Sequence, residues 1–361
     1  MRVALVDLKA QYFSIRDEID EVVARVHSKG LYVMGPEVEA FEEEWARYCG
    51  SVYGVAVSSG TDALYLTLKY FREVEGGTIA NVPAFTFIAT AEAAVRAGMS
   101  LRLVDVDSEG CMLPGPPPSV RSIDIPVNMY GRLAPIVTDR LVTDRLVVED
   151  AAQSHGLQAR GDASCYSFYP TKNLGAHGQA GAVVTSSLLL RDYIRSMRNH
   201  GESNKRFVHD RLSGNYRMDE LQAAILRVKL KYLDRWNARR RQIAQLYVRL
   251  LSDDAIAQVV QMPSLLGEHV FHMFVVRVAE RGSLTTFLEF KGIQTAVRYP
   301  VPLHLQPCLA GHVFYTQDAF PGAKKLAERN VSLPIYPEMS DDQVEYVATQ
   351  VREWVLFGSG A

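Results

Sequence analysis

The spacing of hydrophobic and polar positions changes character near residue 53. Before that point it is helical: residues 7–30 are predicted to form one opening helix, and residues 37–48 a second. Gly35 and Pro36 mark the turn between them, and Pro36 takes the first helical position, which proline favours. The pattern therefore predicts a helical N-terminal arm ahead of the main body.

From residue 53 onward, short apolar runs alternate with helical stretches. The runs occupy 55–57, 78–82, 101–106, 123–127, 146–148, 165–168 and 181–185. Strands that alternate with helices are typical of a mainly parallel sheet covered on both faces. Pro126 cannot donate to a neighbouring strand, so its run is predicted to lie near a sheet edge or a bulge. We therefore predict an α/β fold whose large lobe holds a seven-stranded, mostly parallel sheet.

A long helix is predicted from Asp219 to about Leu251, and its length indicates a bridge between two lobes. Beyond it the pattern predicts a smaller α+β lobe, with strands at 270–278 and 294–298 and helices at 284–290, 322–330 and 341–356. The predicted domains are residues 1–235, comprising the arm and the large lobe, and residues 236–361, the small C-terminal lobe.

Composition narrows the class of protein. Of 361 residues, 48% are hydrophobic and 22% charged, and the net charge is −2, so no excess of either charge indicates a nucleic-acid or membrane-surface partner. The first residues do not form a signal peptide, and no apolar run approaches the ~20 residues that span a bilayer. The four cysteines are scattered, which argues against disulfides and metal sites and favours a cytoplasmic location.

Lys172 is the first candidate for chemistry. The apolar run 165–168 leads into a Pro-Thr turn that places this lysine just past a strand end, where open α/β sheets collect their ligands. A lysine shielded there by aromatic residues would have a lowered pKa and a nucleophilic amine. Such an amine suits a Schiff base with a carbonyl substrate or with pyridoxal phosphate. Most lysines are simply solvated, so Lys172 needs support from other positions.

Other strand ends carry suitable partners. Ser59–Thr61 opens a helix after a strand, so it can bind phosphate through Gly60 and the helix N-terminus, or it can be an ordinary capping box. Asp150 can pair with a protonated ring nitrogen or cap a helix, and Gln153 can reach a ring oxygen.

Further candidates have an equally ordinary alternative. Ser167, in the strand before the lysine, can offer a hydroxyl to phosphate or fill a core position. Phe85 can stack on a flat ring or pack in the core. Asn215 and Arg217 are an uncharged donor and an anion clamp, while residues 219–220 fit helix capping.

With these motifs the sequence resembles the DegT/DnrJ/EryC1/StrS family of pyridoxal-phosphate sugar aminotransferases over nearly its whole length. The matching motifs are Gly35–Phe41, Ser59–Leu64, Pro83–Thr90, Glu149–Gly156, Ser167–Gly175, Asn215–Ala224, Tyr299–Gln306 and Ser332–Pro337. The resemblance implies fold-type-I architecture and a homodimer whose active site is shared between subunits.

The resemblance also implies a role for each residue. Lys172 would form the Schiff base with the cofactor and act as the catalytic base, Asp150 would pair with the ring nitrogen, and Gln153 would meet the ring hydroxyl. Phe85 would stack on the ring. The phosphate would be held by Gly60, Thr61 and Ser167, joined by Asn215 from the other subunit.

The implied reaction moves an amino group from an amino acid, by resemblance L-glutamate, to a nucleotide-linked keto-sugar, with pyridoxamine phosphate as the intermediate form of the cofactor. Arg217, Arg298, Tyr299 and His304 are the expected substrate contacts. Arg298 stands where many relatives have histidine, which adds a clamp for a diphosphate. The segment 299–306 resembles relatives that act at C-3 more than those that act at C-4.

Three alternatives differ in their sequence signals. A sugar dehydratase on the same scaffold typically lacks the lysine that stands here as Lys172. A non-catalytic regulatory protein would not need Asp150, Gln153 and Lys172 together. A nicotinamide enzyme would carry G-x-G-x-x-G after its first strand, and this chain does not.

Two segments are shorter than in most relatives. They are residues 107–147, which contain the doubled Val-Thr-Asp-Arg-Leu, and residues 156–164.

Overall fold

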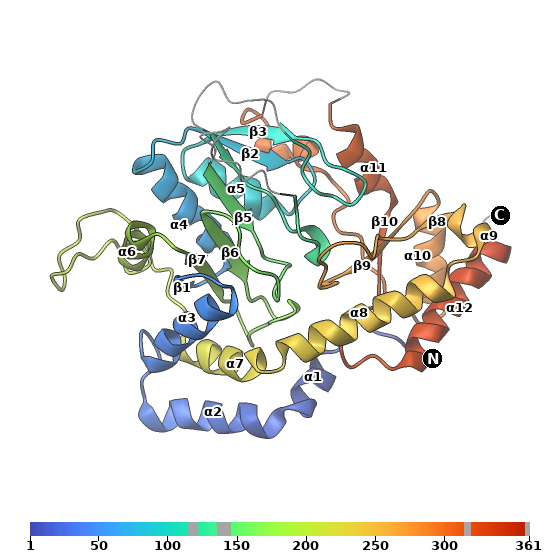
Figure 1. Cartoon of the computed structure of the whole chain (residues 1–361), viewed down its shortest axis with the longest axis horizontal. Coiled ribbons are helices and arrows are strands. Elements are labelled where there is room, and N and C mark those ends of the chain that lie inside the picture. Colours follow the sequence, from blue (N-terminus) through green and yellow to red (C-terminus); the bar gives the residue numbers. More distant parts are fainter. Residues whose placement is uncertain (115–121, 136–145, 314–318, 358–361) are drawn as a thin grey trace.

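The large lobe is built on a seven-stranded sheet with the order β1-β7-β6-β5-β4-β2-β3 (Figure 1). Its strands are β1 Tyr53–Val57, β2 Ile79–Pro83, β3 Ser100–Val104, β4 Ser122–Asp124, β5 Leu146–Asp150, β6 Ala163–Ser167 and β7 Gly181–Thr185. Strand β7 runs antiparallel to both of its neighbours, and the other neighbouring strands are parallel. The sheet confirms the predicted α/β class and its mostly parallel character.

This computed structural model describes residues 1–114, 122–135, 146–313 and 319–357. The doubled Val-Thr-Asp-Arg-Leu pentapeptide therefore lies outside the described residues, apart from Leu146.

Successive side chains along the strands enter two different cores, one on each face of the sheet. Val55 and Val57 pack into the core formed with α4 (Gly60–Glu73), α5 (Ile88–Arg96) and α6 (Leu188–Met197). Ala56 packs on the opposite face, with α3 and α7. Because both faces are covered, the strands are apolar throughout and their carboxyl ends are the natural place for a site.

The second face carries two layers of helix. Helix α3 (Pro36–Tyr48) and helix α7 (Glu220–Leu230) lie against the sheet, and α2 (Arg16–Lys29) packs on α7 through a separate apolar cluster. The short α1 (Leu8–Ser14) precedes α2.

The small lobe contains an antiparallel three-stranded sheet in the order β10-β9-β8. Its elements are α9 Asp254–Ala257, β8 Val260–Gln261, β9 Phe274–Val278, α10 Arg281–Phe290, α11 Pro321–Arg329, β10 Asn330–Leu333 and α12 Asp341–Phe357. Helix α8 (Leu233–Leu250) runs from α7 to α12 and so joins the two lobes (Figure 1). The predicted boundary between residues 235 and 236 falls inside α8 and stays a prediction.

Two predicted helices are each divided in the structure. The opening helix is broken at Ile15, whose side chain is buried against the cluster of α2 and α7. The predicted helix 219–251 is broken at Lys231 and Tyr232 into α7 and α8. Helix α7 packs on α2 and α3 in the large lobe, and α8 begins in that lobe, at Leu233 and Trp236, before it reaches α12 in the small lobe.

Two strand predictions are wrong in detail. Strand β4 is central rather than at an edge, and it ends at Asp124, so Pro126 lies past its end and gives only its carbonyl, to Asp150 N, at 3.0 Å. Within 294–298 no strand forms; Ala296 makes an isolated bridge to Ser332.

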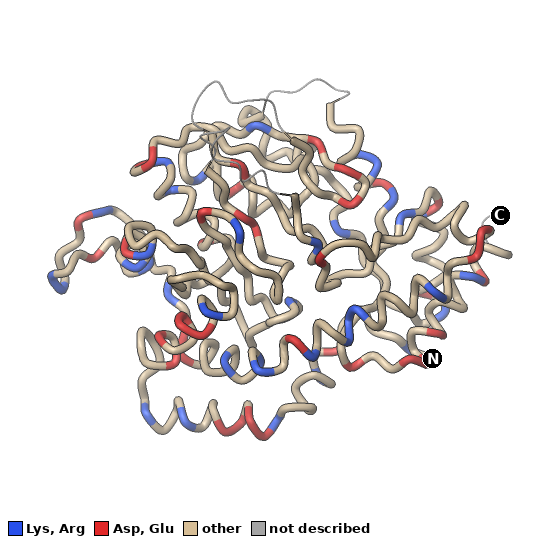
Figure 2. Tube along the Cα trace, in the orientation of Figure 1, with Lys and Arg blue, Asp and Glu red and all other residues tan. Residues whose placement is uncertain are grey.

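Charge is grouped along the helices (Figure 2): α2 has its acidic residues in its first half and its basic residues mainly in its second, and α8 has one aspartate followed by five arginines. Among the described residues, no helix is both long enough and apolar enough to cross a membrane.

Candidate active site

Lys172 follows the carboxyl end of β6, in a turn closed by its N–H donating to Tyr169 O at 2.8 Å. The side chain is partly buried, and burial lowers the pKa of the amine to about 8; the positive charge of Arg298 adds to this, and the carboxylate of Asp150 opposes it. Within the described residues its amine forms no hydrogen bond or ion pair. Lys172 therefore carries a substantial fraction of free, neutral amine near neutral pH.

Asp150 ends β5, the parallel neighbour of β6, so its carboxylate lies at the same edge of the sheet as Lys172. Thr90 Oγ1 donates to Oδ2 at 2.7 Å, and Ala152 N donates to Oδ1 at 3.2 Å. Burial raises the pKa of this carboxyl group, and the bond from Thr90 and the charge of Lys172 oppose the rise. A buried carboxylate of this kind favours a cationic partner, such as a protonated ring nitrogen.

Gln153 is oriented by two tyrosines. Its Oε1 accepts from Tyr130 N at 2.8 Å, and its Nε2 lies 3.4 Å from the hydroxyl of Tyr299. The amide nitrogen is thereby directed toward Tyr299 and remains able to donate to a ring hydroxyl.

The Ser59–Thr61 turn forms the predicted helix cap, and its geometry is compatible with the predicted phosphate site. Ser59 caps α4 by accepting from Asp62 N at 3.1 Å, and Ser59 O accepts from Ala63 N. This leaves the first two helical N–H groups, those of Gly60 and Thr61, for an anion. A Cβ on Gly60 would lie only 2.6 Å from the Cβ of Ser167, so the turn and the end of β6 form one cradle that only glycine permits.

These residues fit pyridoxal phosphate. The cradle presents the N–H groups at the start of α4 to a phosphate, Asp150 is a buried carboxylate for a ring nitrogen, and Lys172 is an amine of lowered pKa for a carbonyl. All of them follow the carboxyl ends of β1, β5 or β6.

The aromatic candidates surround Tyr299. Phe85 is fully buried, and its ring centroid lies 6.3 Å from that of Tyr299. Phe87, at the N-cap of α5, is exposed and lies 5.5 Å from the same ring. Stacking of Phe85 on the cofactor stays a prediction.

Asn215 and Arg217 lie on the stretch between α6 and α7, which extends from the large lobe (Figure 1). Asn215 is exposed, and Arg217 Nη1 donates to Asn199 Oδ1 at 2.8 Å. Between them, Tyr216 O accepts from Ser58 N at 2.9 Å, so the last part of this stretch lies beside the phosphate cradle of its own chain.

The predicted substrate contacts divide into two groups. Arg298 has an exposed side chain near Lys172, and its backbone is held by Asn330 Oδ1 and by the hydroxyl of Tyr130. His304 is only 3% exposed, and its ring packs against Phe320 at 5.1 Å. The structure thus places Arg298 at the site and leaves His304 with almost no surface for a ligand.

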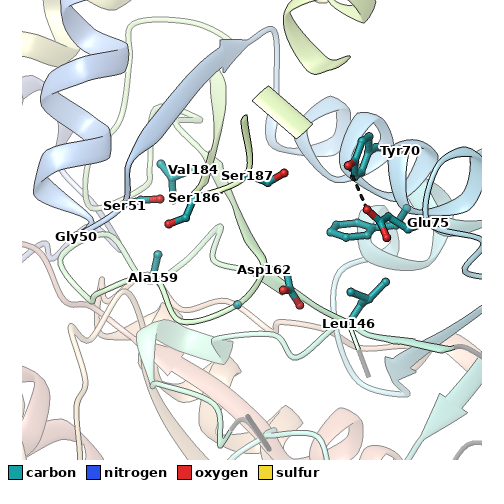
Figure 3. Close-up of a pocket in the computed structure, with 12 residues that line it drawn as sticks. Gly50, Ser51, Tyr70, Glu75, Leu146, Ala159, Asp162, Val184, Ser186 and Ser187 are labelled. Atoms are coloured by element: carbon teal, nitrogen blue, oxygen red, sulfur yellow. Dashed lines mark hydrogen bonds between the residues drawn. The ribbon is translucent and has the colours of Figure 1, made fainter. Parts of the chain in front are cut away.

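A cavity of about 600 Å³ lies at the opposite edge of the sheet (Figure 3). It is lined by Ser51, Leu146 and Asp162, which precede or begin β1, β5 and β6, and by Tyr70, whose hydroxyl donates to Glu75 at 3.2 Å. None of the predicted cofactor residues lines it, so it is separate from the site at Lys172.

Two residues at the site were missed by sequence reasoning. Thr90 holds the carboxylate of Asp150, and Tyr130 contacts both Gln153 and Arg298. Thr90 ends the matching motif 83–90, but the motif gave it no role, and Tyr130 lies outside every motif; only the fold brings both residues to the site.

Comparison with known proteins agrees with this geometry. The model of the DegT/DnrJ/EryC1/StrS aminotransferase family matches residues 14–352. The chain is 36% identical to a Geobacillus stearothermophilus protein named "Pleiotropic regulatory protein", over 98% of this chain and 99% of that protein. It is 38% identical to a Streptomyces venezuelae "dTDP-3-amino-3,4,6-trideoxy-alpha-D-glucose transaminase", over 98% of this chain and 96% of that protein.

The crystal structure of S. venezuelae DesV in complex with ketimine intermediate matches the fold with a TM-score of 0.90, at 37% identity and with 98% of each chain covered. Both the family match and these relatives extend over the arm and both lobes. The chain therefore belongs to the DegT/DnrJ/EryC1/StrS aminotransferase family.

Proposed function

We propose that this protein is a pyridoxal-phosphate-dependent aminotransferase that moves an amino group from L-glutamate to a nucleotide-linked keto-sugar. The observation that carries the proposal is that Lys172 and Asp150 lie at neighbouring strand ends, where the charge of each shifts the pKa of the other. The glycine cradle suited to phosphate lies at the same edge of the sheet. Membership of the aminotransferase family supports the same reaction.

Bound pyridoxal phosphate supplies an electron sink for the chemistry at the donor's α-carbon. The neutral amine of Lys172 takes the proton from that carbon as a general base, and the resulting ammonium returns it as a general acid. Asp150, held by Thr90, keeps a proton on the ring nitrogen. The N–H groups of Gly60 and Thr61, with Ser167, anchor the phosphate, so the reacting atoms stay within reach of Lys172.

A nucleotide-linked acceptor suits the charge of the site. The exposed guanidinium of Arg298 can pair with a diphosphate in bidentate fashion. Amination at C-3 is supported by the segment 299–306 and by the Streptomyces relative, whose name specifies a 3-amino sugar.

A shared active site in a homodimer completes the proposal. Asn215 is exposed on a stretch whose large apolar side chains Phe207 and Leu212 are 76% and 98% exposed. Exposed side chains of this size are typical of a surface that a partner covers. We infer that Asn215 reaches the phosphate of a second subunit, because it is exposed on a stretch that extends from the large lobe of its own chain (Figure 1).

A regulatory protein on the same scaffold is the second candidate, because one relative carries a regulatory name. Such a protein has no need of a neutral lysine beside a buried aspartate, so the intact site favours a catalyst. Lys172 likewise disfavours a dehydratase of the kind that lacks this lysine.

The test begins with purified protein and pyridoxal phosphate. Borohydride should fix the cofactor on Lys172, located by peptide mass spectrometry, and not on Lys229, which has a pKa of about 8 as well but donates to Gly175 O at 2.7 Å. Glutamate should then convert the bound cofactor to the pyridoxamine form, and dTDP- and UDP-linked 3-keto and 4-keto sugars identify the acceptor. Wild-type protein that binds the cofactor but is never converted by glutamate would refute the aminotransferase.

A further inference from the structure

Tyr130 links the cofactor side of the site to the substrate side through two different groups. It lies in the short helix η1 (Met129–Gly131) after β4. Its N–H donates to Gln153 Oε1 at 2.8 Å, while its hydroxyl donates to Arg298 O at 2.5 Å. Gln153 Nε2 lies 3.4 Å from the hydroxyl of Tyr299, the residue after Arg298. Tyr130, Gln153, Tyr299 and Arg298 therefore form a closed ring of contacts. The ring joins the large lobe to the segment that carries Arg298.

The backbone of Tyr130 adopts a conformation that a bulky side chain rarely takes. Its φ is 59° and its ψ is 9°, in the left-handed region, and Gly131 follows with a φ of 92°. A Cβ on Gly131 would lie 2.9 Å from His272 N and 3.0 Å from Gln153 O. Strained residues persist where surrounding contacts hold them, and they cluster at functional sites. This backbone conformation points the N–H of Tyr130 toward Gln153 and its side chain toward Arg298.

Within the described part of the chain, two hydrogen bonds hold the backbone of Arg298 itself. Its peptide is held by Asn330 Oδ1, which accepts from Arg298 N at 2.8 Å, and by the hydroxyl of Tyr130. The Arg298 and Tyr299 side chains themselves project toward the site. The ring of Tyr130 is 6% exposed and packs edge-on to Phe85, with centroids 6.5 Å apart. Its hydroxyl is thus fixed in place before any ligand binds.

We propose that Tyr130 is a positioning residue with two separate tasks: its backbone N–H orients Gln153 for the cofactor, and its hydroxyl orients Arg298 for the diphosphate of the acceptor. The inference rests on the proposed function, since it assumes a nucleotide-linked acceptor. The two tasks can be tested separately in the two half-reactions, because removing the Tyr130 hydroxyl leaves its N–H and Gln153 unchanged.

The experiment is Tyr130→Phe, compared with Tyr193→Phe, which removes a phenol that donates to Glu73 at 2.6 Å between α4 and α6. In Tyr130→Phe, the concentration of keto-sugar nucleotide at half-maximal rate should rise roughly tenfold, as expected for the loss of one hydrogen bond to the positioning peptide. Cofactor affinity, the visible spectrum and the single-turnover rate with glutamate should stay within about twofold of wild type. Tyr193→Phe should change neither half-reaction.

A double-mutant cycle with Arg298→Ala identifies the route of the effect. If Tyr130 acts through Arg298, Tyr130→Phe adds no further loss for the acceptor in the Arg298→Ala background. Equal loss in both half-reactions, or a fall in thermal stability with unchanged acceptor binding, would overturn the inference. If Tyr130→Phe does not fold, Arg298→Ala still tests the inference, because it changes an exposed side chain. Unaltered acceptor binding in Arg298→Ala would also overturn the inference. If wild-type protein fails with glutamate, the proposed function itself is wrong.

Discussion

At the scale of single residues, two lysines show that burial alone does not make a catalyst. Lys172 and Lys229 both have a pKa lowered to about 8 by burial. Lys229, on α7, is buried, and its amine donates a hydrogen bond to Gly175 O. Lys172 has no such bond within the described residues and lies beside Asp150 and Arg298. We therefore expect Lys172, which is accessible and has no competing acceptor among the described residues, to be the amine that reacts.

The pKa of Lys172 predicts how cofactor capture depends on pH. Only the neutral amine attacks a carbonyl, so the rate should rise with pH up to about 8 and then level off. The same reaction with a free lysine side chain, whose pKa is about 10.4, should become faster with pH up to about 10.4. Stopped-flow absorbance after mixing cofactor-free protein with pyridoxal phosphate measures this, and N-acetyl-lysine is the control. A rate that still rises between pH 9 and 10 contradicts the lowered pKa.

At the scale of elements, a carboxylate from one helix caps another. Sequence analysis fits Asp219 and Glu220 to the start of their own helix, yet Asp219 makes no side-chain cap bond there. Glu220 instead accepts from Gly35 N at 2.8 Å, Glu37 N at 2.9 Å and Val38 N at 3.0 Å, at the start of α3. The negative charge also suits that helix end. The cap thus joins α7 to α3 on the face of the sheet opposite α4.

Glu220→Ala should lower the free energy of unfolding by about 3 kcal/mol, because it leaves three buried N–H groups without an acceptor. Glu220→Gln should lower it less, since one amide oxygen still accepts. Urea unfolding of the cofactor-free protein followed by circular dichroism measures both changes. Glu43→Ala, an exposed glutamate on the same α3, is the control and should change stability by no more than about 0.5 kcal/mol. A loss below about 1 kcal/mol for Glu220→Ala would show that the cap is dispensable.

At the scale of the whole molecule, a buried polar network joins the lobes beneath the reactive lysine. Asn173, next to Lys172, donates to Asn237 Oδ1 on α8 at 2.8 Å and to Val270 O at 3.1 Å, and its Oδ1 lies 3.1 Å from His272 Nδ1. Because both amide hydrogens of Asn173 are used, its oxygen faces His272, which must carry its proton on Nδ1. The lysine turn is therefore fixed to the junction of the two lobes.

A shared site predicts complementation between one inactive variant and one variant that binds the cofactor weakly, measured at a cofactor concentration too low to fill the second. Lys172→Ala should lose aminotransfer, and Asn215→Ala should bind the cofactor more weakly. In a mixed dimer, one of the two sites combines the intact Lys172 of one subunit with the intact Asn215 of the other, so activity should return to about half of wild type per dimer. Differently tagged subunits, refolded together and purified through both tags, provide the measurement. Mixed dimers without activity, or a protein that stays monomeric in light scattering, would contradict the shared site.

The sequence by itself determined the layers of the fold and which candidate cofactor residues follow the carboxyl ends of its strands. The alternation of apolar runs with helical stretches predicts the seven-stranded sheet, because strands buried on both faces must be apolar throughout. Ser59–Thr61, Asp150 and Lys172 follow such runs directly, so their place at one edge follows from parallel strand direction alone.

The tertiary structure alone decided where helices break and which residues support the site. The break at Lys231 has no glycine or proline to signal it; α7 packs on α2 and α3, whereas α8 continues from the large lobe to α12 in the small lobe. Thr90, Tyr130 and Glu220 act across 60, 168 and more than 180 positions of sequence respectively. Local pattern carries no information about such pairs, because their contacts exist only after distant elements have packed.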